Sequence, residues 1–360
     1  MNIVNSVSTK DLEDLDARLF QKKATLSSAI KEPRNMETQK IMAELKCQFY
    51  PDASMPITIE GFPFQKKYFY HRALRGNKEL LQDLGIYNPD VDEYYECFDP
   101  LSSHVTYRKG STLSEIERNL FKKATIFPYH VLNPKGELLS ASLRSKEGLP
   151  NQNVYITSNN AAMSSGIHMI FFAQNDGDRA IRQVYHEGFL FWIDDLMFNQ
   201  LGSTKYRGFF NNTGAGHSMH TWHGQILTDS FPIFVWLNEK KLFKKSGVIE
   251  TSKRDWALPG YYIRYLPNEK NQILCDSEAI IKDWIANPAH TFNLLFQLNE
   301  NCCREMFIVP RHKELRYIQP NGVNDKISIA GLESAGILII ESWKTFYEFP
   351  KDTEEFILIA

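Results

Sequence analysis

Residues 214–225 read GAGHSMHTWHGQ and hold three of the ten histidines of this 360-residue chain. These histidines, His217, His220 and His223, recur at intervals of three, and Gln225 follows the last of them. A turn-forming run of Asn, Thr and Gly residues precedes the histidines, and an apolar pair follows Gln225. We therefore predict a strand over 205–212, a glycine loop, and a second strand that carries the histidine motif.

The second strand divides into two faces, because alternate residues of a strand point to the same side. Thr221, His223 and Gln225 share one face, and His220 and Trp222 share the other. His223 and Gln225 are therefore predicted to point together at one ligand. His220 joins them only from the loop or across a β-bulge, which shifts the face by one residue.

A nucleophilic site is the first interpretation of this stretch. A neutral imidazole attacks phosphorus and forms a labile phosphoramidate that passes the group on. Gln225 would donate to a phosphate oxygen without titrating. The backbone N–H groups of the Gly214–Ala215–Gly216 loop would turn toward the phosphate as an anion-binding nest.

Two other interpretations compete with nucleophilic catalysis. Three histidines at intervals of three could ligate zinc, although that spacing suits a helix better than a strand. Alternatively, the histidines are structural and are satisfied by backbone carbonyls near a surface loop. The adjacent Gln225 and the glycine loop favour the phosphate site over the structural interpretation.

His223-Gly224-Gln225-Ile226 resembles the nucleophile strand of the galactose-1-phosphate uridylyltransferase branch of the histidine-triad superfamily. That strand has the pattern His-x-His-x-Gln, with the second histidine as nucleophile. The GDP-hexose phosphorylases fit the longer stretch from Arg207 to Pro232 best. The chain departs from the pattern at Thr221, where the first histidine of the family would fall, and has His220 one position earlier.

The resemblance implies an α+β fold of antiparallel sheets with packed helices, built from two histidine-triad-like halves. Only the first half, 151–237, would carry the catalytic histidines, and 238–360 would be a degenerate second half with a closing helix. Residues 1–150 are predicted to form an N-terminal region of unclear fold, with a helical start followed by mixed strands. Periodicity predicts further elements: helices over 8–31, 36–45, 178–200, 277–286 and 342–349, and strands over 153–157, 166–172, 291–298, 305–309 and 336–340.

Substrate binding is assigned to residues around the histidine strand and to three basic positions. In the family, a Gly-His pair that opens an apolar strand lies near the nucleotide, and His168 resembles it with Ile167 inserted after Gly166. Arg311 and Lys313 are candidates for an acceptor phosphate, and Arg207 is a similar candidate; exposed charges after a strand are also often only solvated. The complete set is Asn212, Gly214, Ala215, Gly216, His217, Thr221, His168, Arg207, Arg311 and Lys313.

The hypothesis is a nucleotidyltransferase or phosphorylase acting on a nucleoside diphosphate sugar or dinucleoside polyphosphate. His223 would form a covalent nucleotidyl intermediate, Gln225 would hold a non-bridging oxygen, and His220 or His217 would orient the ligand or assist the leaving group. Phosphate or a sugar phosphate would then be the acceptor, which gives ping-pong kinetics. The alternatives are a hydrolase of the same fold, with water as acceptor, and a non-catalytic nucleotide-binding module.

Composition limits the partners. A net charge of −2 gives no field that favours nucleic acid or an anionic membrane. The five cysteines are scattered and contain no CxxC pair, so we predict no zinc ribbon and no disulfide framework. We predict no cofactor, no metal, no nucleic-acid or membrane partner, and a cytoplasmic location. The resemblance leaves a homodimer open, since the fold often dimerises.

Overall fold

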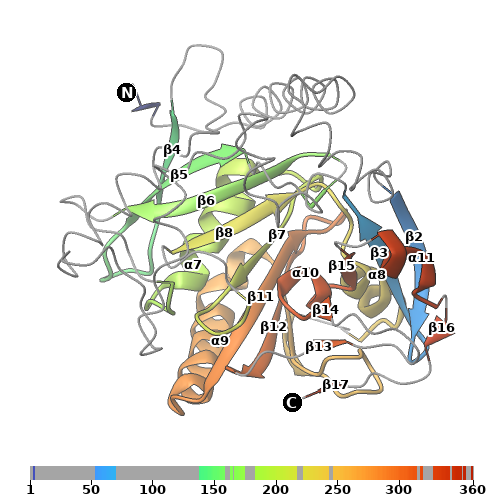
Figure 1. The fold of residues 1–360 in the computed structure, drawn as a ribbon. Helices are drawn as coiled ribbons and strands as arrows, with labels where there is room; N and C mark the ends of the chain where they lie inside the picture. The colour runs from blue at the N-terminus through green and yellow to red at the C-terminus, as the bar shows by residue number, and fades with distance from the viewer. Residues whose placement is uncertain are drawn as a thin grey trace, which may run out of the picture.

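The structure, a computed structural model, describes the chain in segments (Figure 1). The described residues are 3–4, 53–69, 138–158, 163–164, 166–174, 183–216, 222–242, 246–313, 317–318, 327–340, 343–350, 352–353 and 358–359. The helices predicted over 8–31 and 36–45 lie outside these residues. The described part is an α+β structure of mixed sheets and helices. Its helices include none with the length and apolar character needed to span a membrane.

A ten-stranded sheet forms the centre of the described structure. Neighbouring strands in it are antiparallel, except that β1 and β4 are parallel. In spatial order the strands are β1 (Ile3–Val4), β4 (Leu138–Leu143), β5 (Gln152–Ser158), β6 (His168–Gln174), β8 (His223–Leu227), β7 (Arg207–Asn211), β11 (His290–Leu298), β12 (Arg304–His312), β10 (Tyr261–Tyr265) and β9 (Gly247–Glu250). The predicted strands over 153–157, 166–172, 205–212, 291–298 and 305–309 are all present.

Both faces of this sheet are covered. One core packs α7 (Phe189–Asp194), the π-helix Asp195–Leu201 and α9 (Lys270–Ile285) against the sheet. The other core contains α8 (Pro232–Glu239), α10 (Gly331–Ser334) and α11 (Trp343–Glu348) together with a second sheet, and Figure 1 places these on the opposite side. The second sheet has the order β15 (Ile337–Ile340), β3 (Phe62–Tyr68), β2 (Ala53–Ile59) and β16 (Asp352–Thr353).

Smaller elements complete the list. A three-stranded sheet joins β14 (Ile327–Ser328), β13 (Tyr317–Ile318) and β17 (Leu358–Ile359), and a 3-10 turn at Pro267–Glu269 precedes α9.

Burial on both faces explains the apolar run in β11. Leu294 and Phe296 belong to the core with α7 and α9, whereas Leu295 between them belongs to the core with α8 and α10. A strand that is buried on both sides loses the alternation of apolar and polar residues that marks a half-exposed strand. The strands of the two predicted halves meet here, because β7 pairs directly with β11. The boundaries at 150 and 237 and the two-half interpretation stay predictions.

The helix predicted over 178–200 is wrong over 183–188, and residues 178–182 lie outside the described ranges. Residues 183–188 are not helical, and α7 begins at Phe189 after Gly188, which has a left-handed backbone with φ 81°. A left-handed residue interrupts a right-handed helix, so the apolar spacing before Gly188 does not continue the helix. The end at Gly202 is confirmed, but the last turns are a π-helix in which Gly202 N donates to Met197 O at 3.1 Å.

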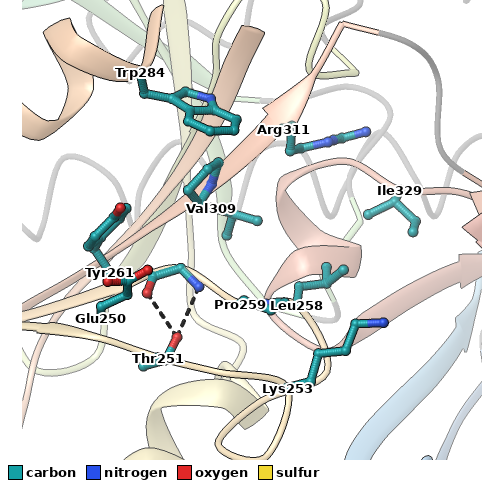
Figure 2. A pocket seen from close by; sticks show the side chains of 12 residues that line it. Glu250, Thr251, Lys253, Leu258, Pro259, Tyr261, Trp284, Val309, Arg311 and Ile329 are labelled. Atoms are coloured by element: carbon teal, nitrogen blue, oxygen red, sulfur yellow. Dashed lines mark hydrogen bonds between the residues drawn. The ribbon is translucent and has the colours of Figure 1, made fainter.

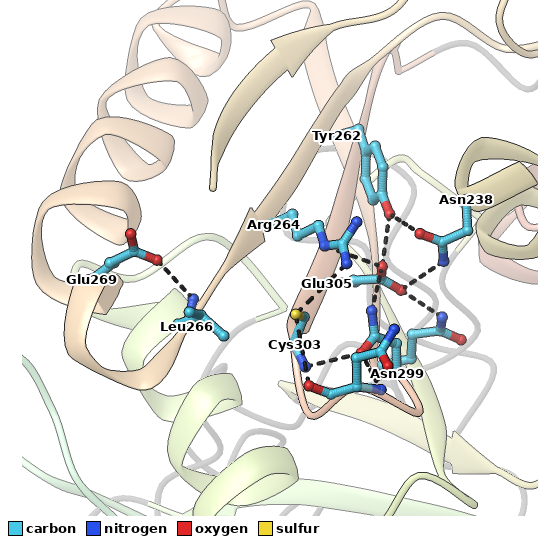
Figure 3. Close-up of polar contacts among 10 residues, drawn as sticks. Asn238, Tyr262, Arg264, Leu266, Glu269, Asn299, Cys303 and Glu305 are labelled. Atoms are coloured by element: carbon cyan, nitrogen blue, oxygen red, sulfur yellow. Dashed lines mark hydrogen bonds and ion pairs between the residues drawn. The ribbon is translucent and has the colours of Figure 1, made fainter. Parts of the chain in front are cut away.

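Two further helix predictions need correction. α9 begins at Lys270, not at 277. Leu274 lies two helical turns before Ile281 on the same buried face, so the apolar stripe extends further toward the N-terminus than predicted. Leu266 N donates to Glu269 Oε2 at 3.1 Å just before this start (Figure 3). α8 was not predicted; Pro232 opens it at a position where a missing N–H costs nothing.

A buried carboxylate at the start of β12 ties this strand to β10, to β11 and the turn between β11 and β12, and to α8 (Figure 3). Glu305 is fully buried and accepts from Tyr262 Oη at 2.8 Å, Gln297 Nε2 at 2.7 Å, Asn299 Nδ2 at 3.0 Å and Asn238 Nδ2 at 3.3 Å. Burial and then the Glu305 charge raise the pKa of Tyr262, so its hydroxyl stays a neutral donor. The cluster satisfies its own polar groups and serves the fold.

Asp194, the last residue of α7, anchors the helical layer to the sheet. It is fully buried, and Arg304 Nη1 donates to its Oδ1 at 2.7 Å. Tyr265 Oη donates to the same oxygen at 2.8 Å, and Lys270 Nζ lies 3.4 Å from Oδ2. Burial raises the pKa of Asp194 although Arg304 and Lys270 oppose the shift. Its hydrogen bonds are therefore needed to keep a charge in this position.

We expect Asp194→Ala to lower the free energy of unfolding by about 3–5 kcal/mol, because it leaves Arg304 buried without its charged partner. The matched control is Lys282→Ala, which removes an exposed ion pair with Glu187 and should leave stability at the wild-type level. Urea unfolding measures both. Equal stability of the two variants would contradict the anchoring role.

Candidate active site

The predicted histidine strand is β8, and it lies inside the large sheet between β6 and β7. Its alternation is confirmed: Trp222 and Ile226 belong to the core with α7, and Leu227 belongs to the core with α8 and α10. His223 and Gln225 therefore share the second face with Leu227. Gly224 is required by packing, since a Cβ there would lie 2.2 Å from Phe171 Cζ.

His168 on β6 orients the side chain of Gln225. Met163 N donates to His168 Nδ1 at 2.7 Å, so the ring proton resides on Nε2. Nε2 lies 2.6 Å from Gln225 Oε1 and donates to it. Both side chains are buried. Because Oε1 of Gln225 accepts from His168, the orientation of the carboxamide is set, with its NH₂ as the donor end.

The carboxamide of Gln183 holds the main chain of His223. The β7–β8 pairing ends at Phe210 and Gly224, and Gln183 takes the next positions of the ladder. Its Oε1 accepts from His223 N at 2.6 Å, and its Nε2 donates to His223 O at 2.9 Å and to Asn211 O at 2.7 Å. The Gln183 side chain thus bridges β7 and β8 at the point where the two strands separate.

The glycine loop packs closely against two other segments. Gly214 and Gly216 have left-handed backbones with φ 80° and 85°. A Cβ on Gly214 would lie 2.8 Å from Lys313 Cγ, and one on Gly216 would lie 2.7 Å from Ala330 Cβ. Ala215 N donates to Asn212 O at 2.9 Å within the turn. The predicted phosphate nest of the loop backbone stays a prediction.

A buried polar chain crosses three strands beside the loop. Asn293 Nδ2 donates to Asn211 Oδ1 at 2.7 Å and to Ala215 O at 2.8 Å. Arg311 Nη1 donates to Asn293 Oδ1 at 2.8 Å and to Ala215 O at 3.2 Å. Arg311 is 2% exposed. The alternative interpretation of Arg311 as an exposed, solvated charge is therefore wrong.

The structure brings some predicted site residues together and separates others. His168 contacts Gln225, and His223 shares a strand face with Gln225. Arg311 and Lys313 lie against the loop, which is formed by Asn212, Gly214, Ala215 and Gly216. Arg207 lies at the opposite end of β7 from Asn211, about 13 Å away along the strand. Its Nη1 donates to Lys205 O at 2.8 Å, and burial lowers its pKa. His217, His220, Thr221 and the predicted bulge lie outside the described residues.

Sequence analysis missed Gln183 and Asn293 as site residues. Gln183 fell inside a predicted helix, and Asn293 fell inside an apolar strand, where each is one polar residue without a motif. A metal site is a separate question: in the described ranges, no three or more His, Cys, Asp and Glu side chains come close enough together to hold an ion.

No protein-family model and no curated protein matches the sequence. Among solved structures, the chain is similar to yeast Ap4A phosphorylase Apa2 in complex with AMP, with 12% identity over 91% of this chain and 92% of that chain and a TM-score of 0.44. A further crystal structure of Apa2 has 11% identity over 94% of this chain and 90% of that chain, with a TM-score of 0.43. The complex of Apa2 with Ap4A has 12% identity over 92% of each chain, with a TM-score of 0.44.

These TM-scores and identities are too low to assign a fold family or an activity. The fold and the site define the chain as an α+β protein with a buried His-Gly-Gln strand inside a ten-stranded sheet.

We expect Gln183→Met to destabilise the protein by about 3 kcal/mol or more, because three buried backbone groups lose their partner. Amide hydrogen exchange should rise at residues 223–225. The control is Gln272→Met, which removes an exposed contact with Asp276 on α9 and should change neither quantity. Unchanged exchange at 223–225 in Gln183→Met would disprove the clamp.

Proposed function

We propose that the protein is a nucleotidyltransferase or phosphorylase that acts on a nucleoside diphosphate sugar or a dinucleoside polyphosphate. His223 is the nucleophile, and Gln225 binds the phosphate that is attacked. The observation that supports this best is the pair itself: two residues on one face of a buried strand, with the amide of Gln225 oriented by His168 at 2.6 Å.

The reaction has two displacements. A ring nitrogen of neutral His223 attacks the α-phosphorus, and an N–P bond forms while the P–O bond to the leaving sugar phosphate or nucleotide breaks. The leaving oxygen takes the electron pair. Inorganic phosphate or a sugar phosphate then attacks the same phosphorus, the N–P bond breaks, and imidazole is regenerated. No redox change occurs, and the nucleotidyl group is the only group transferred.

Gln225 acts on the charge that develops in each displacement. Its amide NH₂ donates to a non-bridging oxygen, and it carries no charge that would repel the substrate. His168 does not touch phosphorus; it is a positioning residue that holds the Gln225 carboxamide in one orientation. Fixed donors of this kind need little reorganisation when the phosphorus oxygens gain charge.

Burial favours transfer over hydrolysis. His223 is 3% exposed and Gln225 is 8% exposed. A nucleotidyl-histidine in such a position is shielded from bulk water, so a bound phosphate acceptor competes better than solvent. This argument supports a transferase or phosphorylase in preference to a hydrolase of the same chemistry.

Intact-mass spectrometry tests the intermediate. Incubation with nucleoside diphosphate sugars and dinucleoside polyphosphates without phosphate, followed by an alkaline quench, should give a nucleoside monophosphate adduct. His223→Ala should lose the adduct, whereas His312→Ala, an exposed histidine on β12, should keep it. Added phosphate should discharge it to a nucleoside diphosphate.

Each other outcome of this experiment has a defined meaning. Rapid discharge by water alone would replace the transferase with a hydrolase. Nucleotide binding without an adduct for any substrate would leave a binding module and would overturn the proposal.

Steady-state kinetics test Gln225 and His168. Gln225→Glu should lower kcat about 10²- to 10³-fold, because a carboxylate replaces a donor at the phosphate. His168→Leu should lower kcat about 10- to 100-fold with little change in KM, and His168→Gln should recover part of the loss because an amide keeps a donor toward Gln225. A fall in thermal stability that accounts for the whole loss in His168→Leu would contradict the positioning role.

A further inference from the structure

A cavity of about 320 Å³ lies at the end of β12, away from His223 (Figure 2). Its walls come from the loops around β9 and β10, the C-terminal end of α9, the end of β12 and the segment before α10. β7 and β11 separate β12 from β8, so the strand spacing places β12 about 14 Å from the histidine strand. The size is at the lower end of the range for small-molecule sites.

One side of the cavity is aromatic. Figure 2 shows Tyr261 of β10 and Trp284 of α9 there. Trp284 is fixed on both its edge and its face: Nε1 donates to Thr291 O at 2.7 Å, and the His290 ring stacks on it with centroids 3.9 Å apart. Burial and the nearby Glu250 raise the pKa of Tyr261, so its hydroxyl is neutral. A fixed indole together with a neutral phenol ring suits a flat ligand.

The opposite side is cationic. Lys253 is exposed on the loop after β9, and Arg311 is buried at the end of β12, with Ile329 in the same part of Figure 2. Glu250, the acidic residue of the lining, stands with Tyr261 on the other side. The positive charge is therefore concentrated at one end of the cavity, where it attracts an anion.

The wall between β9 and β10 is preformed. Thr251 N and Oγ1 donate to Gly260 O at 2.7 and 3.0 Å, and Gly260 N donates to Thr251 Oγ1 at 2.9 Å. A Cβ on Gly260 would lie 2.2 Å from Ile308 O, so this glycine lets the loop press against β12. A wall that is already ordered adds little conformational cost to binding.

We propose that this cavity binds a small molecule that combines a flat ring with a phosphate group, of which a nucleoside monophosphate is the simplest form. The ring lies against Tyr261 and Trp284, and the phosphate lies between Lys253 and Arg311. The site is separate from His223 and needs no transfer reaction. Arg311 connects it to the glycine loop, because the same guanidinium donates to Ala215 O.

Photolabelling of the 360-residue chain with 8-azido-AMP tests this site. Mass spectrometry of the digested protein should place the label within 251–284, and excess AMP should prevent labelling better than adenosine or inorganic phosphate alone. Isothermal titration of AMP should give an affinity about 10- to 100-fold weaker in Lys253→Glu, which loses a charge-assisted contact. Lys240→Glu, an exposed lysine on the C-terminal side of α8, is the matched control and should bind as wild type.

Two variants separate this proposal from the proposed function. His223→Ala should keep the label within 251–284 even if the adduct chemistry fails. Trp284→Leu should weaken AMP binding because it removes one of the ring surfaces that contact the base. If Trp284→Leu does not fold, Lys253→Glu still tests the site. Labelling only outside 251–284, or equal AMP affinity in Lys253→Glu and Lys240→Glu, would overturn the cavity as a nucleotide site.

Discussion

The clamp that Gln183 places on His223 is the interaction on which the rest of the site depends. Strands β7 and β8 must separate where the glycine loop begins. Without Gln183, separation would leave two buried carbonyls and one buried amide N–H without hydrogen-bond partners. Gln183 satisfies all three with a single carboxamide. The first residue of β8 is thereby held as firmly as a residue in mid-strand, although its neighbour β7 has already ended.

The covered faces of the sheet impose the second constraint. Polar groups on a doubly buried sheet need partners within the protein, and they find them in rows across strands. His168 and Gln225 form one row, and Asn211, Asn293 and Arg311 form another. Each row joins strands that are adjacent in the sheet, and two of these pairs, β6 with β8 and β7 with β11, are distant in sequence. Loss of one member therefore affects both strands that it joins.

Much of the sheet could be predicted from the sequence, because apolar runs bounded by turn residues mark strands such as β11 and β12 directly. The pairing of His223 with Gln225 on one face also followed from the two-residue period. The start of α7 could not be predicted, because the apolar spacing continues on both sides of Gly188 and gives no sign of its left-handed backbone. Gln183 and Asn293 could not be found, because their partners lie 40 and 82 residues away and depend on the strand order.

The parallel pairing of β3 with β15 has a consequence for the newly made chain. Gln65 is aligned with Ile337, 272 residues later, so β3 and β15 cannot pair until residue 340 has left the ribosome. At ordinary synthesis rates the two strands emerge roughly 14 to 54 s apart. During that interval β3, which carries Phe62 and Phe64 of the second core, can pair with β2 on one side, but its other edge stays open. An apolar strand with an open edge is prone to pair with other chains until β15 is available.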